Sequence, residues 1–158
     1  MDNRWREQYE RIKRWYTRLL ESDAINDRRV DDFYSFFTCC FHLKDWLKND
    51  PSVDQAIRDE AEAAVSSNRW LGLCADITNG SKHLRIDRRV RVDASSRVEK
   101  VEPAFQRNFV QQNAFQVGGI VVVAGGNVWD AQDVAGQCMR AWDEFLTIKG
   151  LESGEKEG

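Results

Sequence analysis

The stretch that decides the fold is DRRVDDFYSFFTCCFHLKDWLK, residues 27–48. Its apolar side chains surround most of a helical circumference instead of forming one stripe, which is typical of a helix buried on several sides. The pattern stops before Asp50, a favoured N-cap, and Pro51, a favoured first residue of a helix. We therefore expect a central helix over 27–48, followed by a third helix from Pro51 to about Ser66.

Amphipathic patterns on both sides of this stretch predict three more helices. Residues 4–21 repeat apolar side chains at steps of four and three, which places them on one face of a helix. A fourth helix is expected from about Ser67 or Asn68 to Asn79-Gly80 or one turn later, and a last one from the N-cap Asp130 to about Thr147. The apolar faces are formed by Trp5, Tyr9, Ile12, Tyr16 and Leu19, then Trp70, Leu73, Cys74 and Ile77, then Val134, Cys138, Ala141, Trp142 and Phe145.

Between the fourth and the last helix, the spacing of the apolar residues changes to that of strands. Residues 84–92 alternate apolar and charged side chains, and 98–101 can add an edge strand. The strongest strand is expected at 115–124, where β-branched residues follow one another and a Gly-Gly-Asn turn ends it. We predict a mainly α fold, a helical bundle of about five helices with a small antiparallel β-sheet or hairpin before the last helix.

The length and composition indicate a single globular domain. The 158 residues are enough for one substantial core and too few for two ordinary domains. We expect a helical domain over 1–149 with a β insertion at about 84–124, and a flexible tail over 150–158. The net charge of −3 means that any nucleic-acid binding must depend on a local patch.

No segment of the sequence predicts export or membrane insertion. The N-terminus lacks the continuous apolar stretch of a signal peptide, and the longest apolar run is far shorter than the about 20 residues that cross a bilayer. The four cysteines lack the spacing of a disulfide or zinc framework, so we expect reduced, mostly buried thiols. The protein is therefore expected to be cytoplasmic, with no membrane contact, metal or cofactor.

Polar residues on the fourth helix form the main candidate site. If that helix reaches His83, then Asp76, Asn79 and His83 fall within about 60° of one another around its axis. An imidazole suits general acid or base catalysis near neutral pH, so one hypothesis makes His83 catalytic, with Asp76 or Asn79 orienting it. The alternative is structural: Asn79 ends the helix, and His83 bonds a free carbonyl.

Two further groups of residues are candidates for ligand binding. His42 and Asp45 share a face of the central helix, where they either bind a ligand or form a buried structural pair. Residues 82–97 hold six basic side chains against two acidic ones. That segment predicts either a phosphate-facing patch or a charged hairpin edge that discourages strand pairing. The phosphate-binding residues would be Lys82, Arg85, Arg88 and Arg89.

The outer face of the first helix is basic. It is interpreted either as an RNA-binding or membrane-binding face, or as a solvated surface balanced by nearby glutamates. Its basic residues are Arg4, Arg6, Arg11, Lys13, Arg14 and Arg18, and the glutamates are Glu7, Glu10 and Glu21.

The stretch NGSKH, residues 79–83, lies on a helix that follows another buried helix and resembles the HEPN superfamily. Members are small helical bundles, many of them RNA-cleaving toxins or phage-defence components. Their motif is an Arg, four to six residues and a His, often with an Asn just after the Arg. His83 matches the His and Asn79 the polar position, whereas Asp-Ile-Thr at 76–78 stands where the Arg is expected.

This resemblance implies a domain that engages RNA or another phosphate-bearing ligand, in a toxin or phage-defence setting. Family members that cleave RNA use the Arg to stabilise phosphate charge and the His for proton transfer, with two protomers building the site. A homodimer or a complex with a partner protein is therefore expected, and an enzyme of this kind would be a metal-independent ribonuclease. The missing Arg argues against catalysis. The alternative is a non-catalytic protein-interaction or regulatory module whose polar residues are structural.

Overall fold

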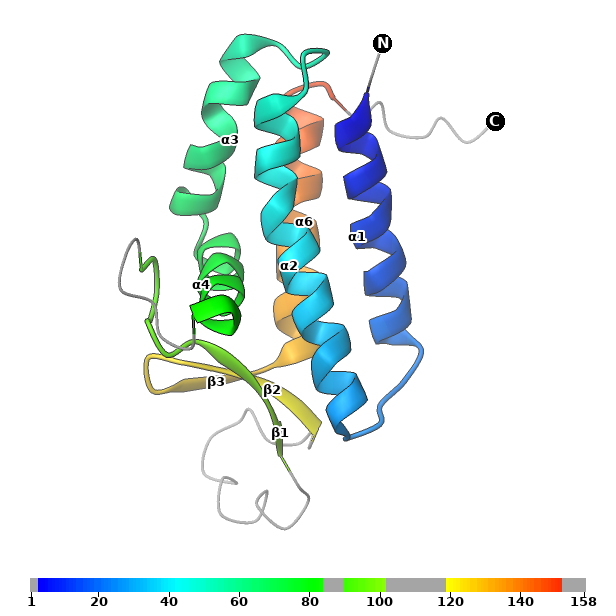
Figure 1. Ribbon diagram of the computed structural model, residues 1–158, viewed down its shortest axis with the longest axis vertical. Helices are drawn as coiled ribbons and strands as arrows, with labels where there is room; N and C mark the ends of the chain where they lie inside the picture. Colours follow the sequence, from blue (N-terminus) through cyan, green and yellow to red (C-terminus); the bar gives the residue numbers. More distant parts are fainter. Residues whose placement is uncertain (1–2, 84–89, 102–118, 152–158) are drawn as a thin grey trace.

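The computed structural model describes residues 3–83, 90–101 and 119–151. Within these ranges it contains five helices and a three-stranded antiparallel sheet that precedes the last helix (Figure 1). The predicted mainly α architecture is therefore confirmed. None of the helices in these ranges is both long and apolar enough to span a bilayer.

Helix α2 (Asp27–Asn49) is the central helix that its all-round apolar pattern predicts. It lies between α1 (Arg4–Leu20) and α3 (Gln55–Ser67), with α6 (Ala131–Ile148) behind it in Figure 1. Burial of a large apolar side chain contributes about 1.5–3 kcal/mol, so the facing aromatic residues of these helices dominate the core. Fully buried aromatic side chains include Trp5, Phe33, Phe36, Phe37 and Trp142.

The start of α3 differs from the prediction. The helix begins at Gln55, and Pro51 lies in the turn before it. Asp50 does not cap α3, because its carboxylate accepts the backbone N–H of Trp5 at 3.0 Å and that of Ser52 at 2.9 Å. Trp5 lies in the first turn of α1, where backbone N–H groups have no partner within the helix. Asp50, the residue that follows α2, therefore caps the neighbouring helix α1.

The remaining two helices begin with the caps that their sequences favour. Helix α4 (Arg69–His83) extends one turn beyond Asn79, the longer of the two expected boundaries. The Asn68 side chain accepts two backbone N–H groups of its first turn, at 3.0 and 3.1 Å. Asp130 caps α6 as predicted, accepting a first-turn N–H at 3.0 Å.

The sheet contains β1 (Arg97–Val101), β2 (Gly119–Ala124) and β3 (Asn127–Asp130), in that order. It lies at one end of the bundle, against α2, α4 and α6 (Figure 1). The expected strands at 98–101 and, over its described part, at 115–124 are confirmed. β3 is not among the expected strands. Gly125 and Gly126 have φ angles of 56° and 76°, which form a hairpin turn and return the chain along β2.

The expected strand over 84–92 is wrong for residues 90–92, which form no strand. Residues 84–89 lie outside the described residues. The backbone N–H groups of Arg91 and Val92 are bonded to the side chain of Asp76. They are therefore unavailable for pairing in a sheet.

Candidate functional site

Helix α4 carries Gly72, Asp76 and Gly80 at intervals of four residues, so the three lie on one stripe. Segment 90–96 packs against this stripe. A Cβ atom at Gly72 would lie 3.4 Å from the Arg91 Cβ, and one at Gly80 would lie 3.3 Å from the carbonyl oxygen of Ser96. Glycine in a helix interior costs about 1 kcal/mol relative to alanine. Here that cost permits the close approach of the segment.

Asp76 is fully buried beneath this segment. Its carboxylate accepts the backbone N–H groups of Arg91 at 3.0 Å, Val92 at 2.5 Å and Asp93 at 3.0 Å. Hydrogen bonds to a charged group contribute about 1.5–3 kcal/mol each, so three of them hold the segment firmly on α4. Asp76 therefore fixes the backbone of segment 90–96 and does not line an open cleft.

The structure describes only some of the other predicted site residues at the end of α4 and after it. Asn79 is half-buried, and Lys82 is exposed. His83 is the last residue of α4, and the structure does not describe its side chain. Three predicted phosphate-binding residues lie outside the described residues: Arg85, Arg88 and Arg89.

His42 and Asp45 share the outer face of α2, as their spacing predicts. The expectation of a buried pair is wrong, because His42 is exposed and the Asp45 side chain is 47% exposed. Asp45 instead pairs with its neighbour Lys44 at 2.8 Å.

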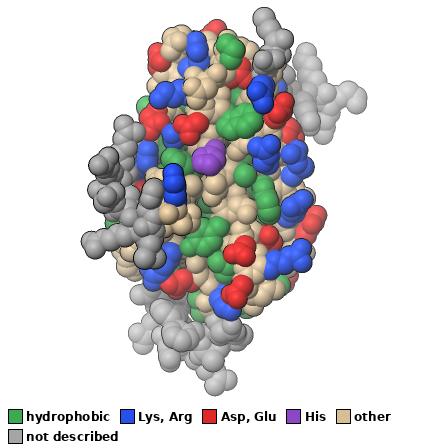
Figure 2. Space-filling model, in the orientation of Figure 1, with side chains coloured by type: hydrophobic (Ala, Val, Ile, Leu, Met, Phe, Trp, Pro, Cys, Tyr) green, Lys and Arg blue, Asp and Glu red, His purple; other side chains and the backbone are tan. Residues whose placement is uncertain are grey.

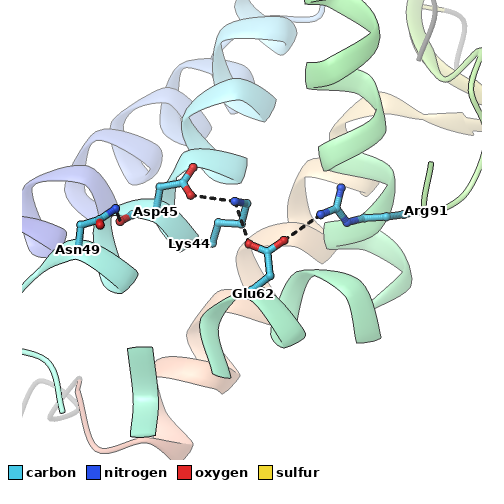
Figure 3. Close-up of polar contacts among 5 residues, drawn as sticks. All are labelled: Lys44, Asp45, Asn49, Glu62 and Arg91. Atoms are coloured by element: carbon cyan, nitrogen blue, oxygen red, sulfur yellow. Dashed lines mark hydrogen bonds and ion pairs between the residues drawn. The ribbon is translucent and has the colours of Figure 1, made fainter. Parts of the chain in front are cut away.

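Lys44 also belongs to an ionic cluster that joins three segments of the chain (Figure 3). Glu62 of α3 bridges Lys44 of α2 at 3.0 Å and Arg91 at 3.1 Å. Both cations lie over the ring of Phe41, 4.8 Å and 5.7 Å from its centroid. We call Phe41, Lys44, Glu62 and Arg91 the closed cluster. With Asp45 included, its two positive and two negative charges cancel.

The ring of Trp46, also on α2, likewise has two cations over it, but in the part of the chain that the structure describes no carboxylate bridges these cations as Glu62 does in the closed cluster. The guanidinium carbons of Arg4 and Arg11 lie 5.8 Å and 5.7 Å from the centroid of its ring. Both distances are within the range of cation–π attraction. No carboxylate in the described ranges forms a salt bridge with either arginine. We call Arg4, Arg11 and Trp46 the open cluster.

A neutral partner holds Arg11 in place. The Arg11 guanidinium donates to the Gln8 side-chain oxygen, and the Gln8 amide nitrogen donates to the Cys39 carbonyl at 2.7 Å. Gln8 is itself buried between α1 and α2. Arg11 is therefore fixed in position, and within residues 3–83, 90–101 and 119–151 it forms no salt bridge, which suits recognition of an anion.

A surface cavity of about 430 Å³ lies beside the open cluster, lined by Arg4, Asp45, Trp46, Asn49, Asp50 and Pro51. Its volume is within the range of small-ligand pockets. Burial opposes the ionisation of Asp50, but hydrogen bonds from Ser52 and from the Trp5 N–H, together with the nearby positive charge of Arg4, outweigh burial and lower its pKa. The Asp50 carboxylate is thus committed to the N-terminus of α1.

Figure 2 shows Lys and Arg side chains along the right-hand edge of the molecule, where α1 runs in Figure 1. Hydrophobic side chains lie among them on the same face. Basic grooves with interspersed aromatic rings bind single-stranded nucleic acids, because the cations contact phosphates and the bases stack on the rings. The basic face of α1 consists of Arg4, Arg11, Arg14 and Arg18, with the half-buried Trp15 and Trp46 beside them. The expectation that Arg6 and Lys13 share this face is wrong, because they lie about half a turn away around the helix, over the rings of Trp5 and Tyr9.

Three thiols meet in the core. Cys40, Cys74 and Cys138 are fully buried, as expected, and their sulfur atoms all lie within 4.8 Å of one another. Burial opposes ionisation of Cys40, yet its interactions with the Cys138 and Cys74 thiols and with Trp142 lower its pKa to about 5. Burial and the interaction with Cys40 raise the pKa of Cys74 and Cys138.

Sequence reasoning identified the basic face of α1 but missed the open cluster and the thiol cluster. Both are assembled from helices far apart in the chain, so no local spacing reveals them. The role of Asp76 did leave a signal, because glycines four residues before and after an acidic residue are unusual inside a helix.

The chain matches no protein-family model, and neither the curated proteins nor the solved structures compared with it include a match. Its function must therefore be argued from its own surface.

Proposed function

We propose that this domain is a non-catalytic RNA-binding module that contacts single-stranded RNA through the open cluster and the basic face of α1. The observation that carries the proposal is the Trp46 ring, which has two arginines over it and a cavity of about 430 Å³ beside it. A base can stack on the accessible part of the half-buried Trp46 ring, and the arginines beside it can contact the flanking phosphates.

The proposal keeps the phosphate-bearing ligand expected from the sequence but moves its binding surface from α4 to α1 and α2. Asp76 supports this change, because its carboxylate is fully buried and accepts three backbone hydrogen bonds. The HEPN resemblance and a toxin or phage-defence setting stay predictions. A cytoplasmic location, which RNA binding suits, also stays a prediction.

Binding of a fluorescein-labelled oligouridylate of about 12 nucleotides, followed by anisotropy, tests the proposal. Trp46→Ala should weaken binding roughly tenfold, since stacking contributes about 1–3 kcal/mol per base. Trp46→Phe keeps a stacking face and should retain most of the affinity. Equal binding by the parent and both variants would remove Trp46 from the account, and no binding by the parent would refute the proposal.

The same samples test the ribonuclease hypothesis. RNA incubated with the parent protein and a chelator should remain intact, as analysed by gel electrophoresis. Metal-independent cleavage that is lost in His83→Ala, with an unchanged melting temperature, would instead establish the catalytic interpretation of His83.

A further inference from the structure

The three buried thiols are contributed by three different helices. Cys40 is on α2, Cys74 on α4 and Cys138 on α6, and each is 0% exposed. Their sulfur atoms converge to within 4.8 Å of one another. Three sulfurs bound at about 2.3 Å to a common ion would lie about 4 Å apart in a planar arrangement. Shifts of less than about an ångström would therefore complete such a site.

We propose that Cys40, Cys74 and Cys138 form a buried three-coordinate site for a thiophilic metal or metalloid ion. Thiolates select soft ions over hard ones such as Mg²⁺, whose preferred ligands are oxygens. The three cysteines are fully buried and include no residue of the open cluster, so this proposal does not rest on the RNA-binding proposal.

Hydrogen bonds position two of the three sulfurs. The Cys74 thiol donates to the Phe37 carbonyl at 3.0 Å, and the Cys138 thiol donates to the Trp70 carbonyl at 3.4 Å. The Trp142 ring N–H donates to the Cys40 carbonyl at 3.1 Å, which fixes the backbone at the third. A thiol that binds the ion gives up its proton and with it the hydrogen bond that it donates, so the packing of the three helices holds the triangle in the bound state.

The charge of the complex selects among soft ions. An apolar interior strongly disfavours net charge, so a neutral complex is expected. Trivalent arsenic satisfies this with all three sulfurs. Arsenous acid loses three As–O bonds and gains three As–S bonds, and each thiol proton leaves with a hydroxide as water, without oxidation or reduction. A divalent ion such as Cd²⁺ becomes neutral with two thiolates and one remaining thiol, and two protons pass to solvent.

Stoichiometry and thermal stability test the site. The full chain is incubated with one of two probes, Cd²⁺ or arsenite, once as the folded protein and once during refolding from urea, because a fully buried site needs opening for entry. After gel filtration, the parent should retain one ion per chain, and its melting temperature should rise because the ion binds only the native state. Mg²⁺ should give neither effect.

Cys39 provides the matched control, since it is adjacent to Cys40 but lies outside the triangle. Cys39→Ala should retain the ion as the parent does, whereas Cys74→Ala and Cys138→Ala should lose retention at least tenfold. Circular dichroism checks the fold, and valine replaces alanine in any variant that fails to fold. Retention equal to the parent in both triangle variants, or no retention by the parent in either procedure, would overturn the proposal.

Discussion

The closed and open clusters each place two cations over an aromatic ring of α2, yet they differ in what neutralises the cations. In the closed cluster, Glu62 bridges Lys44 and Arg91 at 3.0 and 3.1 Å, so the charges are satisfied within the protein. In the open cluster, Arg11 is held only by the neutral Gln8, and no such acid bridges it to Arg4 among the described residues. Polar residues mark a binding surface only where their partners leave charge uncompensated.

Asp76 resembles the closed cluster by the same criterion, because its carboxylate accepts hydrogen bonds from the backbone of segment 90–96. Substitutions at Asp76 or in the closed cluster should therefore lower the stability of the fold and leave RNA binding intact. Substitutions in the open cluster should do the reverse.

The largest effect is expected from Asp76→Asn. The asparagine amide carries no negative charge, and its NH₂ group would face buried backbone N–H groups that are also donors. The variant should therefore lose about 3 kcal/mol of unfolding free energy. Urea denaturation followed by circular dichroism measures the loss. Asp31→Asn on the exposed side of α2 is the control and should change stability by less than about 0.5 kcal/mol. A similarly small effect of Asp76→Asn would show that its hydrogen bonds do not hold segment 90–96.

Glu62→Gln should have an intermediate effect. It leaves Lys44 and Arg91, whose side chains are each 11% exposed, near each other without their shared carboxylate. We expect a loss of about 1–2 kcal/mol, below the about 3–5 kcal/mol for breaking a fully buried pair. Glu10→Gln removes the exposed Lys13 pair and should cost less than about 0.5 kcal/mol. Equal losses in the two variants, measured by the same denaturation, would contradict the distinction between clusters.

Asp50→Asn should have the smallest effect, about 1 kcal/mol, which is typical of a lost helix cap. The pKa of Asp50 is lowered from its usual value of 3.8, so the ionised form stabilises the fold. That contribution is present above pH 3.8 and is lost as the pH falls through the lower pKa of the folded state. The stability difference between parent and variant should therefore shrink on acidification. A difference that stays constant from neutral pH to below the folded pKa would exclude a role for the Asp50 charge.

The sequence predicts the helices well, because the periodicity of residues 4–21 and 130–147 and the caps at Asn68 and Asp130 are local properties. It fails where a side chain serves distant backbone. Asp50 caps α1 instead of α3, and Asp76 takes the N–H groups that an alternating strand at 84–92 would need.

The same distinction between local pattern and tertiary contact applies to the candidate sites. The basic face of α1 is visible in the sequence because it follows helical periodicity. Trp46 comes to that face only through the packing of α2 on α1, and the three cysteines meet only when α2, α4 and α6 assemble. Such convergence depends on tertiary packing and leaves no spacing in the sequence.

The salt dependence of RNA affinity decides whether the open cluster contacts phosphates, because each lost phosphate contact reduces the slope of log affinity against log salt by about 0.7 for single strands. Two double variants remove equal charge, Arg4→Gln with Arg11→Gln in the open cluster, and Lys82→Gln with Arg97→Gln near the sheet. We expect the slope to become shallower by about 1.4 for the first double variant and to stay unchanged for the second. An unchanged slope for the first and a shallower one for the second would place the RNA on α4 and the sheet, and would refute RNA binding at the open cluster.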